Sequence, residues 1–264
     1  MRLRVALAAV CLLAASGCEV INLRGSPRST DAPVPDALAF TSHSLEIRLE
    51  PTVMLWARDE RLDVRALVDE AVAMIQRDLE APSVPITVQA GSYRTIPDVG
   101  IGGETNPASG EVKVAMDQRS PLGPRRLLTV WLPLVLAHEL HHAKRVLDGP
   151  GYGTTLLEAM VTEGTAEAFV RETFPDAPSI PWVRALGPSE RTVWERVQRE
   201  GDDPDDGAQH DSWFYGGRGL PRWAGYRIGY AIARAYLEHH PDSSAAGLAV
   251  TSAERIVSGS RYDP

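Results

Sequence analysis

The chain has 264 residues, of which 44% are apolar and 23% are charged, and its formal net charge is −8. This composition is that of a globular protein with enough apolar residues for one sizeable domain, and it excludes a disordered or fibrous chain. An acidic chain without a long basic run lacks the electrostatic footprint of a nucleic-acid-binding protein, so neither DNA nor RNA is an expected partner.

The first eighteen residues, MRLRVALAAVCLLAASGC, have the layout of a secretory signal: two arginines, an apolar run and then small residues. The apolar run is too short to span a bilayer as a stable helix. Its ending, Ala15 to Cys18, resembles the lipobox of bacterial lipoproteins, in which the signal is cut before a cysteine that carries a diacylglyceryl anchor. The resemblance implies a signal peptide over residues 1–17 and lipidation of Cys18. The alternative is a plain signal peptide that contains a cysteine.

Lipidation would leave no cysteine pair for a disulfide, because Cys11 leaves with the signal and Cys18 is alkylated. Residues 19–41 are rich in Pro, Ser and Asp and have no apolar periodicity, which indicates a flexible tether. We therefore expect a lipid anchor and tether over residues 18–41 and a domain over residues 42–264. The protein should be held at the cell envelope, facing the periplasm or the cell surface, and the sequence leaves its oligomeric state open.

The predicted domain begins with a short strand and a helix. Leu45, Ile47 and Leu49 alternate on one face, which is typical of a strand. Asp63 is placed to cap a helix over residues 64–81, in which apolar residues recur at helical spacing. These two elements predict the first layer of a mixed fold.

Two more short strands are predicted at VPITVQA, residues 84–90, and GEVKVAMD, residues 110–117. The glycine-rich stretch between them, residues 99–110, precedes a strand and not a helix, so it is interpreted as a loop rather than a phosphate-binding turn. Beyond these strands the pattern predicts an almost wholly helical chain.

The run LAHELHHAKR, residues 136–145, contains three histidines and a glutamate within five consecutive residues. On a helix, His138 and His142 project from the same face one turn apart, as two imidazoles must to reach one metal ion. With Glu139 they form the HExxH pattern, in which the glutamate is the general base of a zinc metalloprotease. His141 is expected to be a core or surface residue. A catalytic zinc site also needs a third protein ligand and an open position.

The next predicted helix supplies candidates for the third ligand. Thr155 and Glu158 have the spacing of a capping box, which gives Glu158 a structural role at the start of the helix. Glu163 and Glu167 share a stripe with apolar residues at 100° per residue. Because a buried carboxylate without a partner is costly, both should face a cation or strong donors. The alternative is that both lie at a solvated edge of the helix.

At this point the chain resembles the gluzincins, in which HExxH is followed on the next helix by a glutamate ligand. The resemblance implies that Glu163 is the third zinc ligand and that Glu167 orients the first zinc histidine, His138. More closely, HELHH, LLEAMVTEGTAEAF and PRWAGYRIGYAIARAYL are similar to an uncharacterised bacterial family of predicted Zn-dependent proteases, the YjaZ-like group. This likeness covers most of the chain from Leu128 to the C-terminus and says little about residues 42–110.

The expected fold is α+β and zincin-like, with a small N-terminal sheet and one helix, a mainly helical C-terminal half, and one zinc ion per chain in the cleft between them. A further donor should face the oxyanion that forms during hydrolysis. Tyr226 is the preferred donor, with Tyr230, Arg227 and His210 as other candidates, although both tyrosines also suit helix packing. By resemblance to the gluzincins, an edge strand would bind the substrate backbone, and residues 110–117 are the expected strand.

The predicted function is a zinc-dependent peptide-bond hydrolase, anchored to the bacterial envelope and acting on a peptide or protein substrate. Two other classes fit the same sequence. A zinc-binding envelope lipoprotein without turnover, acting as a metal carrier or adaptor, would hold zinc but would not need Glu139. A structural envelope lipoprotein with a vestigial site would hold no metal.

Overall fold

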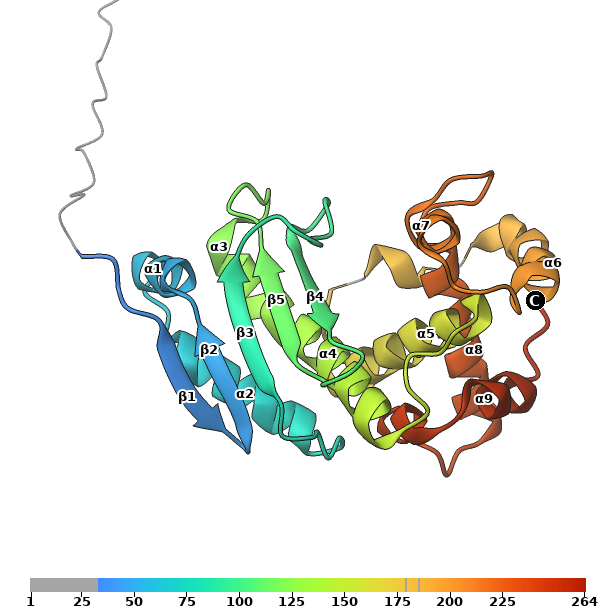
Figure 1. The fold of residues 1–264 in the computed structure, drawn as a ribbon, viewed down its shortest axis with the longest axis horizontal. Helices are drawn as coiled ribbons and strands as arrows, with labels where there is room; N and C mark the ends of the chain where they lie inside the picture. The colour runs from blue at the N-terminus through green and yellow to red at the C-terminus, as the bar shows by residue number, and fades with distance from the viewer. Residues whose placement is uncertain (1–32, 179, 185) are drawn as a thin grey trace, which may run out of the picture. The chain divides into compact units, whose positions relative to one another are not determined.

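A five-stranded sheet is followed by a mainly helical half in the computed structural model, which describes residues 33–178, 180–184 and 186–264 (Figure 1). This arrangement confirms the predicted α+β fold class. The predicted signal peptide, the lipidation site Cys18 and most of the predicted tether lie outside the described residues. Within the described part of the chain, no helix combines the length and the apolar character needed to cross a bilayer.

The sheet has the strand order β1-β2-β3-β5-β4. Its central strands β2, β3 and β5 run parallel, and β1 and β4 pair antiparallel at the two edges. The strands are β1 (Leu38–Ser42), β2 (Leu45–Leu49), β3 (Pro85–Ala90), β4 (Ile101–Thr105) and β5 (Val112–Met116). The three predicted strands are therefore present as β2, β3 and β5, and both edge strands are additions to the prediction.

Strand β1 begins at Leu38, before residue 42, where the sequence pattern placed the start of the domain. Its register with β2 runs from Leu38↔Leu49 to Ser42↔Leu45 around a tight turn. The turn residues His43 and Ser44 both have positive φ, which lets the chain reverse within two residues. The sheet thus includes residues interpreted as tether, because a strand this short has too little alternation to stand out beside a proline-rich stretch.

Two helices, α1 (Pro51–Asp59) and α2 (Val64–Gln76), lie between β2 and β3 in the chain, where one was predicted. Asp63 caps α2 as expected, because its carboxylate accepts a hydrogen bond of 3.0 Å from the Ala66 amide. Helix α2 ends at Gln76, earlier than the predicted residue 81, and packs against α4 (Leu132–Asp148). Helix α4 in turn packs against β4 and β5, which places it beside the edge of the sheet.

The C-terminal half is helical from residue 123 onward, as predicted. Besides α4, its helices are α3 (Gly123–Arg126), the π-helical turn Leu127–Trp131, α5 (Leu156–Thr173), α6 (Glu190–Glu200), α7 (Gly207–Tyr215), α8 (Ala224–His239) and α9 (Ala253–Ser260), with short 3₁₀ turns at Pro181–Val183, Gly187–Ser189 and Ala246–Val250. Helices α5 and α8 cross with their backbones in contact. A Cβ atom on Gly164 would collide with the backbone of Gly229, so this crossing requires glycine on both helices.

Candidate metal centre

Helix α4 carries the HExxH residues on a buried face. His138 and His142 are one turn apart, and their Nε2 atoms lie 2.9 Å from each other. His142 is buried and His138 keeps a side-chain exposure of 14%, so one ring faces a space that solvent reaches. His141 is fully buried in the core, where it stacks on Phe169, so of the two roles expected for it, core or surface, it has the core one.

Helix α5 brings Glu163 to the two histidines. Its Oε2 lies 3.1 Å from His138 Nε2, and its Oε1 lies 3.5 Å from His142 Nε2. Burial by itself would raise the pKa of Glu163, but the two neighbouring histidines hold that pKa well below its ordinary value. Among the described residues, these three side chains form the group whose donor atoms all lie within 4.8 Å of one another.

The donor set fits a zinc ion. Nitrogen and oxygen ligands around tetrahedral zinc lie about 3.3 Å apart when each is about 2.0–2.1 Å from the metal. The observed separations of 2.9, 3.1 and 3.5 Å bracket that value. Two histidines and one glutamate are a ligand set that catalytic zinc sites use, and it leaves a fourth position open. A cation bound here would also explain why a charged Glu163 is buried, because the cation would neutralise the carboxylate.

Glu167, one turn after Glu163, contacts the other nitrogen of the first histidine. Its Oε1 lies 3.1 Å from His138 Nδ1 and also accepts a hydrogen bond of 2.7 Å from Trp182 Nε1. This geometry fits the orienting role that the gluzincin resemblance implies. Burial would lower the pKa of His138, but its bonds to Glu163 and Glu167 raise that pKa well above the ordinary value. The sequence pattern did not indicate Trp182, which comes from the loop after α5.

Glu139 points from α4 toward the edge strand β4. The Thr105 hydroxyl donates a hydrogen bond of 2.7 Å to Oε2 of Glu139, and a Cβ atom on Gly103 would collide with the same carboxylate. Burial raises the pKa of Glu139, an effect that the neighbouring histidines and Thr105 reduce. A carboxylate whose pKa is raised toward neutrality suits a general base.

The strand beside Glu139 is not the one that the sequence predicted. Residues 110–117 were expected to form the substrate-binding edge strand, but β5 lies between β3 and β4 in the interior of the sheet. The edge is β4, within the glycine-rich stretch interpreted as a loop. Its two consecutive glycines, Gly102 and Gly103, obscure any strand pattern, and strand order depends on pairing that no local pattern contains.

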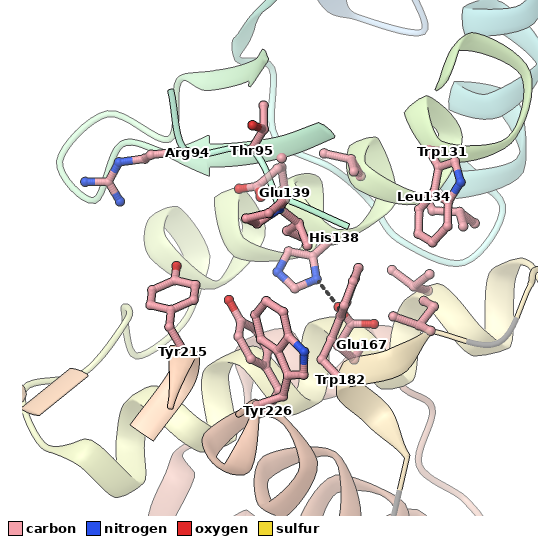
Figure 2. Close-up of a pocket in the computed structure, with 18 of the residues that line it drawn as sticks. Arg94, Thr95, Trp131, Leu134, His138, Glu139, Glu167, Trp182, Tyr215 and Tyr226 are labelled. Atoms are coloured by element: carbon pink, nitrogen blue, oxygen red, sulfur yellow. Dashed lines mark hydrogen bonds and ion pairs between the residues drawn. The ribbon is translucent and has the colours of Figure 1, made fainter. Parts of the chain in front are cut away.

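A cavity of about 620 Å³ opens over His138 and Glu139. Figure 2 shows Trp131 and Leu134 on one side of His138, and Arg94 and Tyr215 on the other. Trp182 lies 6.2 Å from Trp131 between ring centroids, and Val135, Val170 and Ile180 add further apolar groups to the lining. Tyr93, Asp211 and Arg222 contribute polar groups to the lining, as Arg94 and Tyr215 do. The cavity therefore offers two chemically different spaces on either side of the histidine.

Of the four candidate oxyanion donors, Tyr226 lines this cavity, and Tyr230, Arg227 and His210 do not belong to its lining. Burial, together with the negative charge of Glu163, raises the pKa of Tyr226 well above its ordinary value, so the hydroxyl stays protonated as a donor. His210 instead bonds through Nδ1 to Asp205, at 3.0 and 3.1 Å to the two carboxylate oxygens.

Sequence reasoning also missed Tyr152, which donates a hydrogen bond of 2.6 Å to Oε1 of Glu163 from the loop between α4 and α5. No periodic signal marks a loop residue of this kind. Gly103 and Thr105 on β4 and Trp182 in the 3₁₀ turn after α5 were also missed, because each reaches the site through tertiary packing.

Comparison with known proteins places most of this chain in one family model, described as "Predicted Zn-dependent protease (DUF2268)", which matches residues 65–258. The matched region includes α4, α5 and the whole His138, His142 and Glu163 cluster. A curated relative, the uncharacterized protein YjaZ of Bacillus subtilis (strain 168), is 28% identical over 120 residues. That match covers 44% of this chain and 46% of YjaZ, so it spans less than half of either protein.

Proposed function

This chain belongs to the family of predicted Zn-dependent proteases, and on that premise we propose that it is a zinc-dependent peptide-bond hydrolase. The observation that carries the proposal is the convergence of two histidines and a glutamate whose donor atoms lie within 4.8 Å of one another, with Glu139 beside them in the lining of a cavity. A structural cluster would have no need for a carboxylate that faces the cavity and is not part of the donor set.

His138, His142 and Glu163 are the residues that would hold zinc, and zinc bound there would supply a Lewis acid that polarises a peptide carbonyl and activates a water molecule. Glu139 takes the proton of the attacking water and delivers it to the leaving amine. Thr105 fixes the position of the Glu139 carboxylate through its 2.7 Å hydrogen bond. Tyr226 donates to the oxyanion from the cavity wall.

The substrate backbone would pair with the open edge of β4. Ile96 donates a backbone hydrogen bond of 3.0 Å to the Ile101 carbonyl, so the loop before β4 covers the beginning of this edge. Because outward-pointing groups alternate along a strand, the backbone groups of Gly103 and Thr105 face the same side as those of Ile101. An extended peptide that pairs with Gly103 would lie beside Glu139.

The apolar side of the cavity favours peptides that carry a large apolar side chain next to the scissile bond. Trp131 and Trp182 lie 6.2 Å apart between ring centroids, and Leu134 completes the wall nearest His138. Such a surface gains free energy by burying apolar area and leaves a charged side chain without a partner. A peptide library with one randomised position on each side of the scissile bond measures this preference.

The experiment that tests the function is Glu139→Gln, which keeps the size of the side chain but removes the base. Zinc should stay near one ion per chain by elemental analysis, while peptide hydrolysis falls by about two or more orders of magnitude. A metal carrier without turnover would be indifferent to this change. Wild-type protein that holds zinc but cleaves nothing in a broad peptide library would favour the carrier, and wild-type protein without zinc would favour the structural lipoprotein.

We also propose that the protein is lipid-anchored at the cell envelope through Cys18. The support is the sequence of the first eighteen residues, which lie outside the described part of the chain. Cys18→Ser should release the protein from the membrane fraction, because a diacylglyceryl group with an amide-linked acyl chain buries enough CH₂ for stable attachment. Unchanged membrane fractionation of this variant would contradict the anchor.

A further inference from the structure

Tyr152 takes no part in the mechanism above, yet its hydroxyl makes the shortest contact of Glu163 in the described structure. The phenol donates to Oε1 of Glu163 over 2.6 Å, against 3.1 Å from Oε2 to His138 and 3.5 Å from Oε1 to His142. Its ring also lies 5.9 Å from the His142 ring, between centroids. Tyr152 therefore contacts the metal-binding glutamate directly, from outside the donor set.

The two oxygens of Glu163 are consequently in different situations. Oε1 is engaged by the Tyr152 hydroxyl, which points one strong donor at it. Oε2 has His138 Nε2 as its neighbour and receives nothing from Tyr152. A carboxylate held in this way offers one oxygen to a metal more readily than two.

The loop that carries Tyr152 is fixed by both ligand-bearing helices. The Thr162 hydroxyl, directly before Glu163 on α5, donates to the Tyr152 carbonyl over 2.8 Å. Arg145 Nε, one turn after the HExxH residues on α4, donates to that same Thr162 hydroxyl over 2.9 Å. Arg145 and Thr162 are both buried, so this chain of hydrogen bonds is shielded from water. The position of the phenol is therefore set by the same two helices that set the ligands.

We propose that Tyr152 is a positioning residue that reserves Oε1 of Glu163, so that Glu163 binds zinc through Oε2 alone and the fourth position stays open for the reaction. The proposal rests on the metal site of the proposed function. Without the phenol, both carboxylate oxygens become free to bind, and a second oxygen on the metal would occupy the space that water and substrate need.

The test is Tyr152→Phe in the full chain, which keeps the ring and removes only the hydroxyl. Zinc affinity, measured by competition with a chromophoric chelator, should fall by about 10–100-fold, as it does when a hydrogen-bond partner of a metal ligand is lost. The visible absorption spectrum of the protein loaded with Co²⁺ should also change, because the spectrum reports coordination number and geometry.

Tyr262→Phe is the matched control. Tyr262 also donates to a glutamate, Glu190, over 2.5 Å, but it belongs neither to the metal cluster nor to the cavity lining. This control should leave the zinc affinity and the Co²⁺ spectrum unchanged. It therefore separates the loss of any Tyr–Glu hydrogen bond from the loss of the one at the metal.

The outcomes distinguish this proposal from the proposed function. Wild-type protein that binds neither zinc nor Co²⁺ defeats the metal site itself. If the wild type binds zinc, a Tyr152→Phe variant with wild-type affinity and a wild-type Co²⁺ spectrum overturns the positioning role alone. An equal loss of affinity in Tyr262→Phe also overturns it, since the effect would then be a general one on stability.

Discussion

The site has two walls that are built in opposite ways. The helical wall, formed by α4 and α5, presents long polar side chains: His138, His142 and Glu163 as the donor set and Glu139 beside it. The strand wall, formed by β4, presents glycine at Gly103, where even one added carbon would collide with Glu139. The difference teaches that the helical wall supplies the chemistry through side chains, while the strand wall supplies space and an exposed backbone. Substitutions on the helical wall should therefore lower zinc affinity, and substitutions on the strand wall should lower activity while zinc is retained.

The largest expected effect comes from removing a ligand on the helical wall. Glu163→Ala should lower zinc affinity by more than about 100-fold, because it removes a direct ligand and not merely a partner of one. Stability measured in the presence of zinc should fall with it, since binding free energy contributes to folding free energy. Chelator competition and thermal unfolding with and without zinc measure both. Retained zinc in this variant would contradict the assignment of Glu163.

A change on the strand wall should abolish activity and spare the metal. Gly103→Ala places a methyl group against the Glu139 carboxylate and displaces the base, so peptide hydrolysis should fall by about 100-fold or more while zinc stays near one per chain. Gly91→Ala is the control, because no atom lies within 4 Å of its added Cβ and its φ is not positive. Loss of zinc in Gly103→Ala would mean that the two walls are not separable.

A smaller effect is expected from removing Glu167, which contacts the first histidine but is not one of the three proposed ligands. Glu167→Ala leaves all three ligands in place but frees the His138 ring, whose Nδ1 lies 3.1 Å from the Glu167 carboxylate. Zinc affinity or activity should fall by about 10–100-fold. Trp182→Phe removes the 2.7 Å hydrogen bond to Glu167 and keeps an aromatic ring. This variant should also lower zinc affinity or activity, but by less than Glu167→Ala. An affinity loss in Glu167→Ala as large as that in Glu163→Ala would contradict the ranking.

The smallest effect is expected at Glu158, which belongs to the same helix but not to the site. Its Oε2 accepts from the Thr154 and Thr155 amides over 2.7 and 3.1 Å, completing the predicted capping box. Glu158→Ala should cost about 1 kcal/mol or less in the free energy of unfolding and retain the metal. Urea unfolding and zinc content give the two values. A variant that loses zinc here while Glu163→Ala keeps it would reverse the assignment of the third ligand.

The same contrast explains what the sequence could predict. Helical periodicity is local, so the 100° spacing was sufficient to place Glu163 and Glu167 on one stripe of α5, and the capping box fixed where α5 begins. The relation of that stripe to the HExxH histidines came from the resemblance to the gluzincins. The strand wall depends on pairing between distant segments. Residues 110–117 were therefore correctly predicted as a strand but wrongly placed at the edge, because the sheet order is not contained in any one segment.

Loop residues were the other omission. Tyr152 and Trp182 reach Glu163 and Glu167 from the segments before and after α5, and their contacts depend on the path of the backbone through each loop. In the sequence, a tyrosine between two glycines or a tryptophan after a proline could pack in the core, lie at the surface or contact a site, and the local pattern does not distinguish these roles. Only the folded arrangement separates these uses, because it brings the phenol and the indole within hydrogen-bonding distance of two buried carboxylates.

The contact between Gly164 and Gly229 has a mechanical consequence for the proposed metal site. Gly164 directly follows Glu163, so the closest approach of α5 to α8 lies beside the ligand. Two backbones in contact leave no room for one helix to slide or roll on the other, because any such motion compresses hard atoms. The position of Glu163, the proposed ligand, is therefore fixed relative to α8. Any widening of the cavity to admit a substrate must then come from segments outside the α5–α8 contact, such as the loop before β4, whose residues 93–97 line the cavity.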